Sequence, residues 1–187
     1  LGMGGSAAGG DFLSAICDLK GSVPVVVQRD YVIPAWWDEQ WLIIATSHSG
    51  NTEEAIEATE IALKLGATVI VISTGGILSG LAELHYNCYL IPSIGGQPPR
   101  SAFGHIFSRQ LALFRCLGII PNDNDDQAML TRLQAVVEEY DFITNQESDL
   151  LELTAYMETQ PIALLGPSEL TPALIRFKNQ LNENSAR

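Results

Sequence analysis

The sequence has few charged residues and even fewer basic ones. Only 17% of its 187 residues are charged, and 22 aspartates and glutamates outnumber ten lysines and arginines, so the formal net charge is −12. A general affinity for nucleic acid or for an anionic membrane surface needs clustered positive charge, and this balance excludes both. Any phosphate that the protein binds must be held by local dipoles and a few placed cations.

Cysteines and long apolar runs are also scarce. The three cysteines show neither zinc spacing nor a C-x-x-C pair: Cys17, Cys88 and Cys116. This usage is typical of a reducing, cytoplasmic compartment. No apolar run approaches the roughly 20 residues of a membrane span, and the three histidines are not spaced as metal ligands, so we expect no metal site.

Hydrophobic residues, by contrast, make up 47% of the chain, which is enough for a sizeable core. Short runs rich in Val and Ile alternate with helical patterns, of which the best is Glu53–Leu65. The alternation predicts right-handed crossovers and an α/β fold with a doubly wound parallel sheet of the flavodoxin-like type. The expected strands are Val23–Gln28, Trp41–Ala45, Ala67–Ser73 and Cys88–Ile91.

A polar break at Asn122–Asp126 predicts a boundary within the chain. Residues 1–120 are expected to form a first domain that lacks the start of its first strand, followed by a helical connection over 121–160. Residues 161–187 are expected to be the first strand–helix unit of a second, similar lobe, because Pro161–Gly166 resembles the opening of the chain. Both ends are then interior points of a longer protein.

The segment 41–52 is the most informative one. An apolar run ends in a cluster of hydroxyl side chains, and a helical pattern begins directly after it, at Glu53. Such a junction collects free backbone N–H groups and the positive end of the helix dipole, and hydroxyls ligate phosphate well there. The loop has no Lys and no G-x-x-x-x-G-K-[ST], so it does not bind a nucleoside triphosphate. The alternative is that these hydroxyls only cap the helix, as Ser and Thr commonly do.

A second junction is rich in glycine, at Gly2–Gly10. It nearly fits G-x-G-x-x-[GA], and Asp30 stands where a ribose-binding acid would lie, so a dinucleotide site is a competing interpretation. In a flavodoxin-like order, however, Gly4–Ser6 and Ser47–Thr52 converge on one crevice. A dinucleotide needs no hydroxyl-rich loop at that place, whereas a small phosphorylated ligand held from both sides does.

Two further polar residues lie near this edge of the expected sheet. Arg100 follows the strand Cys88–Ile91 and could supply a cation to the crevice, or it could be a solvated surface residue. His48 lies inside the hydroxyl loop and could be a bystander that points away or, less readily, a catalytic histidine. Chemistry alone singles out no general base among the 22 carboxylates.

The hydroxyl loop also matches a known motif. Ser47–Thr52 reads as the S-x-S-G-x-T phosphate loop of SIS (sugar isomerase) domains. With Gly4–Ser6, Pro99–Gly104 and Arg176–Ser185, the chain resembles the bifunctional phosphoglucose/phosphomannose isomerase family along its whole length. The loop motif is specific to SIS domains but not to one reaction, and the segment Arg176–Ser185 is what selects this isomerase.

The resemblance implies roles for individual residues. Arg100 would stabilise negative charge on an enediolate intermediate, and Glu183 would be the base that moves a proton between C1 and C2. His105 stands where relatives often carry an aromatic residue and receives no role. The sugar phosphate would be held by residues of both junctions: Gly5, Ser6, Ser47, Ser49 and Thr52.

The implied function is an aldose–ketose isomerase that interconverts glucose 6-phosphate and mannose 6-phosphate with fructose 6-phosphate. It would need neither a metal nor a redox cofactor, and would act as a cytoplasmic homodimer. The family also uses a His for ring opening and a Lys, both beyond Arg187, so this chain alone is expected to be inactive. The alternative is a non-catalytic SIS domain that senses a phosphosugar, although no helix-turn-helix or basic segment supports a regulator.

Overall fold

The computed structural model describes residues 1–122, 125–141, 143–144 and 149–185. Its contacts divide the chain into two units, one made of Leu1–Pro121 with Gly166–Arg187 and the other of Asn122–Leu165. Asp123 and Asn124 of the predicted polar break lie outside the described residues. None of the helices that the structure describes is both long and apolar enough to cross a membrane.

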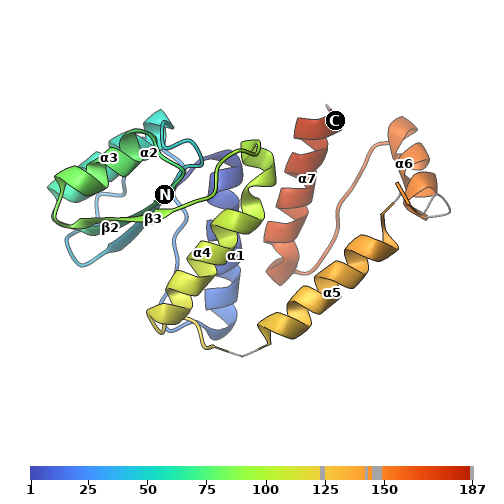
Figure 1. The fold of residues 1–187 in the computed structure, drawn as a ribbon, viewed down its shortest axis with the longest axis horizontal. Coiled ribbons are helices and arrows are strands. Elements are labelled where there is room, and N and C mark those ends of the chain that lie inside the picture. The colour runs from blue at the N-terminus through green and yellow to red at the C-terminus, as the bar shows by residue number, and fades with distance from the viewer. Residues whose placement is uncertain (123–124, 142, 145–148, 186–187) are drawn as a thin grey trace. The chain divides into compact units, whose positions relative to one another are not determined.

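The first unit is built on a parallel sheet of three strands in the order β1-β2-β3 (Figure 1). The strands are β1 (Leu42–Thr46), β2 (Thr68–Ser73) and β3 (Cys88–Pro92). Helices α2 (Glu53–Lys64) and α3 (Gly76–Leu84) pack on one face of the sheet. Helices α1 (Gly4–Lys20) and α4 (Phe103–Cys116) pack on the other. The predicted α/β fold, with helices on both faces of a parallel sheet, is confirmed.

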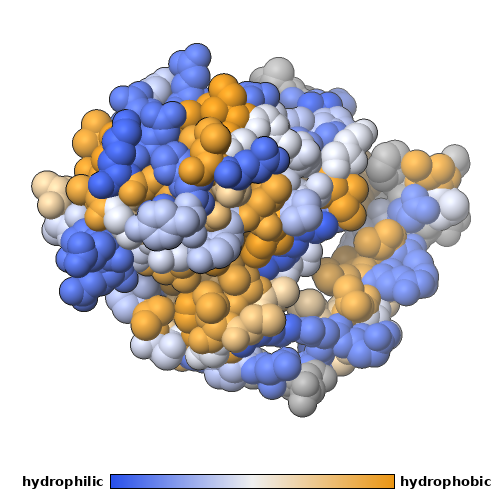
Figure 2. Space-filling view, turned by 60° about the vertical axis from the view of Figure 1, so that its left-hand side comes forward, coloured by the Kyte–Doolittle hydropathy of each residue, from blue (hydrophilic) through white to orange (hydrophobic). Residues whose placement is uncertain are grey.

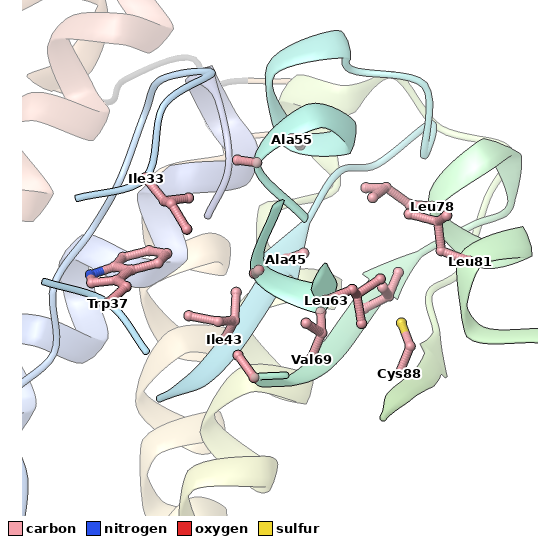
Figure 3. Close-up of a cluster of buried hydrophobic side chains, with 14 residues drawn as sticks. Ile33, Trp37, Ile43, Ala45, Ala55, Leu63, Val69, Leu78, Leu81 and Cys88 are labelled. Atoms are coloured by element: carbon pink, nitrogen blue, oxygen red, sulfur yellow. The ribbon is translucent and has the colours of Figure 1, made fainter. Parts of the chain in front are cut away.

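The core on the α2 side follows from the alternation of side chains along the strands (Figure 3). Ile43 and Ala45 of β1 point to this side together with Val69 and Val71 of β2, because successive strand residues face opposite ways. The α2 helix meets them with small side chains, Ala55, Ala58 and Ala62, which allow the helix to approach the sheet closely. Glu53 and Glu54 in its first turn and Lys64 in its last turn complement the helix dipole.

A second core cluster lies on the opposite face. Leu13 and Cys17 of α1 pack against Phe114 of α4 and Ile120, and Ile44 of β1 contacts this cluster from the sheet. Burial raises the pKa of the Cys17 thiol, with a smaller contribution from the negative charge of Asp18. This cysteine therefore behaves as a packing residue.

The backbone of Leu1 and Gly2 runs alongside β1. The Leu1 amine donates to Ile44 O at 2.7 Å, the Thr46 N–H donates to Leu1 O at 2.9 Å, and the Gly2 N–H donates to Gln28 O at 3.2 Å. The chain therefore passes in the order 23–28, Leu1, β1, as a flavodoxin-like sheet requires.

Val23–Gln28, which the sequence predicts as a strand, forms no regular secondary structure and is not part of the sheet. Among the described residues, the backbone bond from Gly2 to Gln28 is the one that joins it to the neighbouring chain. A single bond at the end of the segment does not make a ladder, and Pro24 has no N–H to donate. The predicted strand was therefore wrong at this place, although the segment lies at the expected edge.

The C-terminal part of the chain returns to the first unit. Pro161–Gly166, predicted as a strand, has no strand pairing within the described part of the chain. It leads through the short 3-10 helix η2 (Ser168–Leu170) into α7 (Thr171–Ser185), which packs against α1 (Figure 1). The second unit contains α5 (Asp126–Glu139) and α6 (Asp149–Thr159). A second lobe beginning at residue 161 stays a prediction.

Candidate functional site

The loops that follow the three strands meet at one edge of the sheet, because parallel strands end on the same side. The loop after β1 runs through Ser47–Thr52 into α2, and the loop after β2 leads into α3. The loop after β3 ends in the 3-10 helix η1 (Pro99–Ser101), which precedes α4. The first turn of α1 lies beside the loop after β1. Both α1 and α2 thus begin at this edge.

The Ser47 and Thr52 hydroxyls form a pair inside the loop after β1. Ser47 is 1% exposed, and its Oγ lies 2.8 Å from Thr52 Oγ1 and accepts the Gly50 N–H at 3.1 Å. Thr52 stands at the N-cap of α2, yet its side chain makes no capping hydrogen bond among the described residues. Helix capping therefore does not explain this hydroxyl. The positive end of α2 stays directed at the loop, which suits an anion.

Gly50 determines the shape of the same loop. Its φ is +72°, and a Cβ at this position would lie 1.8 Å from Gly75 O of the next loop. The contact is reinforced on both sides, since Leu78 donates its N–H to Gly50 O at 3.0 Å and Ile77 donates to Asn51 Oδ1 at 3.1 Å. The loop after β1 is therefore held against the start of α3, and the close approach of Gly50 to Gly75 leaves no space for a side chain at Gly50.

We expect Gly50→Ala to lower the free energy of unfolding by about 2–4 kcal/mol, since it adds left-handed strain to a backbone collision. Urea denaturation measures the change. Gly80→Ala is the matched control, because Gly80 lies within α3 and a Cβ there has no neighbour within 4 Å. That variant should be neutral or slightly more stable, as Gly weakens a helix interior. Equal stability of the two variants would contradict this account of the loop.

The first turn of α1 contacts the hydroxyl loop directly. Ser6 Oγ accepts the His48 N–H at 3.3 Å. A Cβ at Gly5 would lie 3.9 Å from Pro99 O, so the same turn also borders η1. The structure therefore brings Gly5 and Ser6 close to the loop after β1 and to the residue that precedes Arg100.

The His48 side chain does not point away from the neighbouring loops. Its Nε2 lies 3.1 Å from Gln97 O, so the ring turns toward the loop that leads to η1. Its own carbonyl accepts the N–H and the Oγ1–H of Thr74 at 3.1 and 2.7 Å. His48 therefore links the loops after all three strands, a role that its position in the motif does not reveal.

Arg100 and Glu183 are both exposed. Within the described ranges the Arg100 guanidinium has no hydrogen bond or ion pair, so its charge is available to a ligand. Glu183 lies in the last turns of α7, and no described contact joins it to the loops after the strands. The structure thus brings together the predicted site residues of the glycine-rich turn and of the hydroxyl loop, with η1 beside them. Glu183 lies apart from this group, on α7.

Three residues with evident structural roles were missed or undervalued at the level of sequence. They are Asn51, Thr74 and Arg176, whose side chains bond to backbone groups of other segments: α3, the loop after β1 and η1. A polar residue directly after a strand was the available signal for Thr74. Arg176 belongs to a recognised motif, but nothing in its spacing predicted a contact with Arg100.

A pocket of about 410 Å³ lies beside β1, between Leu1, Val23–Val27 and the strand. Its lining is mainly apolar and includes Trp37, Trp41 and Phe114. Ser6 is the one predicted site residue that reaches it. An apolar pocket does not suit a phosphate, so the candidate site is the group of loops and not this cavity.

The described residues also contain no group of three or more His, Cys, Asp or Glu side chains that could hold a metal ion.

Comparison with known proteins agrees with the motifs. No protein-family model matches the chain. A bifunctional phosphoglucose/phosphomannose isomerase of Caldicellulosiruptor bescii is 39% identical over 188 residues, which cover 98% of this chain and 55% of that protein. Other curated relatives carry the same name. Over nearly its whole length, the chain is thus similar to members of the bifunctional phosphoglucose/phosphomannose isomerase family. The resemblance stated from the motifs is thereby confirmed.

The similarity also extends to a protein with another named reaction. A D-glucosamine-6-phosphate 4-epimerase of Sulfolobus acidocaldarius is 30% identical over 99% of this chain and 56% of that protein. The chain spans about half the length of the curated relatives that it matches. Relatives with two different named reactions therefore share similarity with this chain over about half of their length.

Among solved structures, a protein named as a phosphosugar isomerase from Salmonella typhimurium LT2 is similar, with a TM-score of 0.52. The identity is 22%, and the match covers 73% of this chain and 43% of that chain. At this identity the likeness concerns the fold alone, and it agrees with the α/β architecture described above.

Proposed function

We propose that the full-length protein is a phosphosugar isomerase that interconverts glucose 6-phosphate, and mannose 6-phosphate, with fructose 6-phosphate. The observation that carries the proposal is the hydroxyl pair of Ser47 and Thr52 at the start of α2. Ser47 is buried and Thr52 is half-buried, and the neighbouring His48 contacts Ser6 and the loop that leads to Arg100. Two helix N-termini and three hydroxyl-bearing loops form a site for a small dianion in a protein of net charge −12.

In the proposed mechanism, Gly5, Ser6, Ser47, Ser49 and Thr52 hold the phosphate and leave C1 and C2 of the opened sugar to the remaining residues. The Glu183 carboxylate removes the proton from C2 of the aldose and returns it to C1, while the C1 carbonyl oxygen becomes a hydroxyl and the C2 hydroxyl becomes the ketone. Arg100 stabilises the negative charge of the enediolate between these two transfers. This chemistry requires neither a metal nor a redox cofactor.

The alternative is an SIS domain that binds a phosphosugar without converting it. A spectrophotometric assay decides between the two: full-length protein is given fructose 6-phosphate, and glucose 6-phosphate is detected with its dehydrogenase. Turnover supports the isomerase. Binding of fructose 6-phosphate by calorimetry without turnover of it or of mannose 6-phosphate supports the sensor. The 187 residues alone should bind weakly and turn over nothing, since they span about half of the curated relatives' length.

We expect Ser49→Ala to weaken binding of sugar phosphate by the full-length protein by about 1–2 kcal/mol, the contribution of one charge-assisted hydrogen bond. Ser49 is exposed, and its Oγ accepts the Asn51 N–H at 3.2 Å, which leaves its O–H free to donate. Calorimetric titration measures the loss. Ser79→Ala is the control, because Ser79 lies within α3 and donates to Gly75 O. Equal affinities of wild type and Ser49→Ala would remove Ser49 from the phosphate site.

We further propose a cytoplasmic homodimer. The support is the exposed apolar surface: α5 presents a stripe of large side chains at helical spacing, and apolar areas lie among the hydrophilic ones in Figure 2. The stripe consists of Met129, Leu130, Leu133, Val136 and Val137. A low charged fraction of 17% suits a chain that buries much of its surface against another.

A further inference from the structure

Arg176 joins α7 to the loops of the candidate site. Its Nη2 donates to Arg100 O at 2.5 Å, and its guanidinium carbon lies 5.1 Å from the centre of the Phe103 ring. Gln180, one turn later, accepts from Nη1 and Nη2 at 2.7 and 2.8 Å when its amide oxygen faces the guanidinium. The partners of this cation among the described residues are therefore a backbone carbonyl, an aromatic ring and a neutral amide, and none is a carboxylate.

The Phe103 ring that Arg176 contacts is packed against two other aromatic rings. The Phe103 ring stacks on Phe107 at 5.5 Å, and both rings contact Phe12 of α1 at 5.3 and 5.6 Å. The guanidinium also reaches the first turn of α1, since a Cβ at Gly5 would lie 3.7 Å from Nη1. Arg176 thus stands where α1, η1 and α4 meet, on groups that are held in place by their own packing.

Helix geometry connects this contact to Glu183. Residues seven positions apart in an α-helix lie on the same face, about 20° apart in rotation and about 10 Å apart along the axis. Glu183 is the seventh residue after Arg176, so both face the same side of α7. The C-terminal end of α7 lies at the same end of the first unit as the N-termini of α1 and α4 (Figure 1). Moving from Arg176 to Glu183 therefore leads toward the end of the first unit at which α1 and α4 begin.

We propose that Arg176 is a positioning residue, which fixes the rotation of α7 on Arg100 O and Phe103 so that Glu183 faces the site. The inference rests on the proposed isomerase function. It explains why a cation has only neutral partners here: a planar guanidinium can bond to a carbonyl, an amide and a ring face together, whereas a lysine ammonium cannot. Loss of the contact would turn or shift α7, and a displacement of about 1 Å at a reacting group can lower a rate about 10²-fold.

The test measures turnover and binding separately in the full-length protein. Arg176→Ala should lower kcat for fructose 6-phosphate by about 10- to 100-fold. The Kd of sorbitol 6-phosphate, an acyclic phosphosugar that cannot isomerise, should change less than about threefold, because Arg176 holds the helix and not the phosphate. Arg176→Lys should recover part of kcat. Lys178→Ala is the control, since it removes one positive charge from an exposed position of the same helix and should leave kcat unchanged.

Other results would overturn the inference. A large rise in the sorbitol 6-phosphate Kd with kcat retained would make Arg176 a ligand of the phosphosugar, and an unchanged kcat would make it a surface residue. Amide hydrogen exchange of α7 is measured in the same variants, because it does not depend on catalysis. If the wild type binds the phosphosugar but converts none, the proposed function fails. Faster exchange of α7 in Arg176→Ala would then still support the anchor, and unchanged exchange would refute it.

Discussion

Glu183→Gln in the full-length protein is expected to lower turnover of fructose 6-phosphate by about 10²–10⁴-fold, the usual loss when a positioned base is removed. Gln keeps the shape of the side chain, so the affinity for sorbitol 6-phosphate should stay within a few-fold of wild type. Glu183 is exposed at the end of α7, where a neutral replacement has little effect on folding. The dehydrogenase-linked assay and calorimetry measure the two quantities.

The control for this substitution is Glu57→Gln, which changes an exposed carboxylate on α2, three residues after Glu54. It should leave both turnover and affinity close to wild type. Near wild-type turnover in Glu183→Gln would remove Glu183 from the mechanism. The base would then have to come from another of the 22 carboxylates or from the part of the protein beyond Arg187.

Arg100→Met should lower kcat by about 10²–10³-fold, comparable to the removal of one group that stabilises a developing oxyanion. The expected effect on the Kd of sorbitol 6-phosphate is small, because the negative charge that Arg100 meets develops only on the enediolate. The backbone of residue 100 keeps its carbonyl in this variant, so the hydrogen bond from Arg176 to Arg100 O can still form. A change in kcat therefore reports the guanidinium of Arg100 itself.

Arg132→Met is the matched control, since Arg132 is an exposed residue of α5 in the second unit. Its kcat should equal that of the wild type. A tenfold or larger rise in Kd for Arg100→Met with kcat retained would reassign Arg100 to ground-state binding of the phosphate, because uniform binding affects affinity without affecting the chemical step.

Much of the fold could be predicted from local sequence. The strands β1, β2 and β3 coincide closely with apolar runs rich in Val and Ile, and α2 follows the helical spacing of its alanines. These patterns are reliable for β1, β2 and α2 because helices cover both faces of the two strands and one face of α2 is buried. The composition of Val23–Gln28 also favours a strand, but this segment does not join the sheet. A suitable composition cannot supply the neighbouring backbone with which a strand must pair.

Part of the candidate site could likewise be predicted from the sequence, and part of it could not. The sequence by itself determined that a hydroxyl-rich loop joins a buried strand to a helix, that the chain is acidic, and that its motifs resemble those of an isomerase family. Those properties depend on residues that are neighbours in the chain. Only the tertiary structure decided that His48 turns to Gln97 and that Arg176 reaches Arg100, since these partners are 49 and 76 residues apart. Such contacts depend on how the packed helices and sheet place distant loops, and no local pattern records that placement.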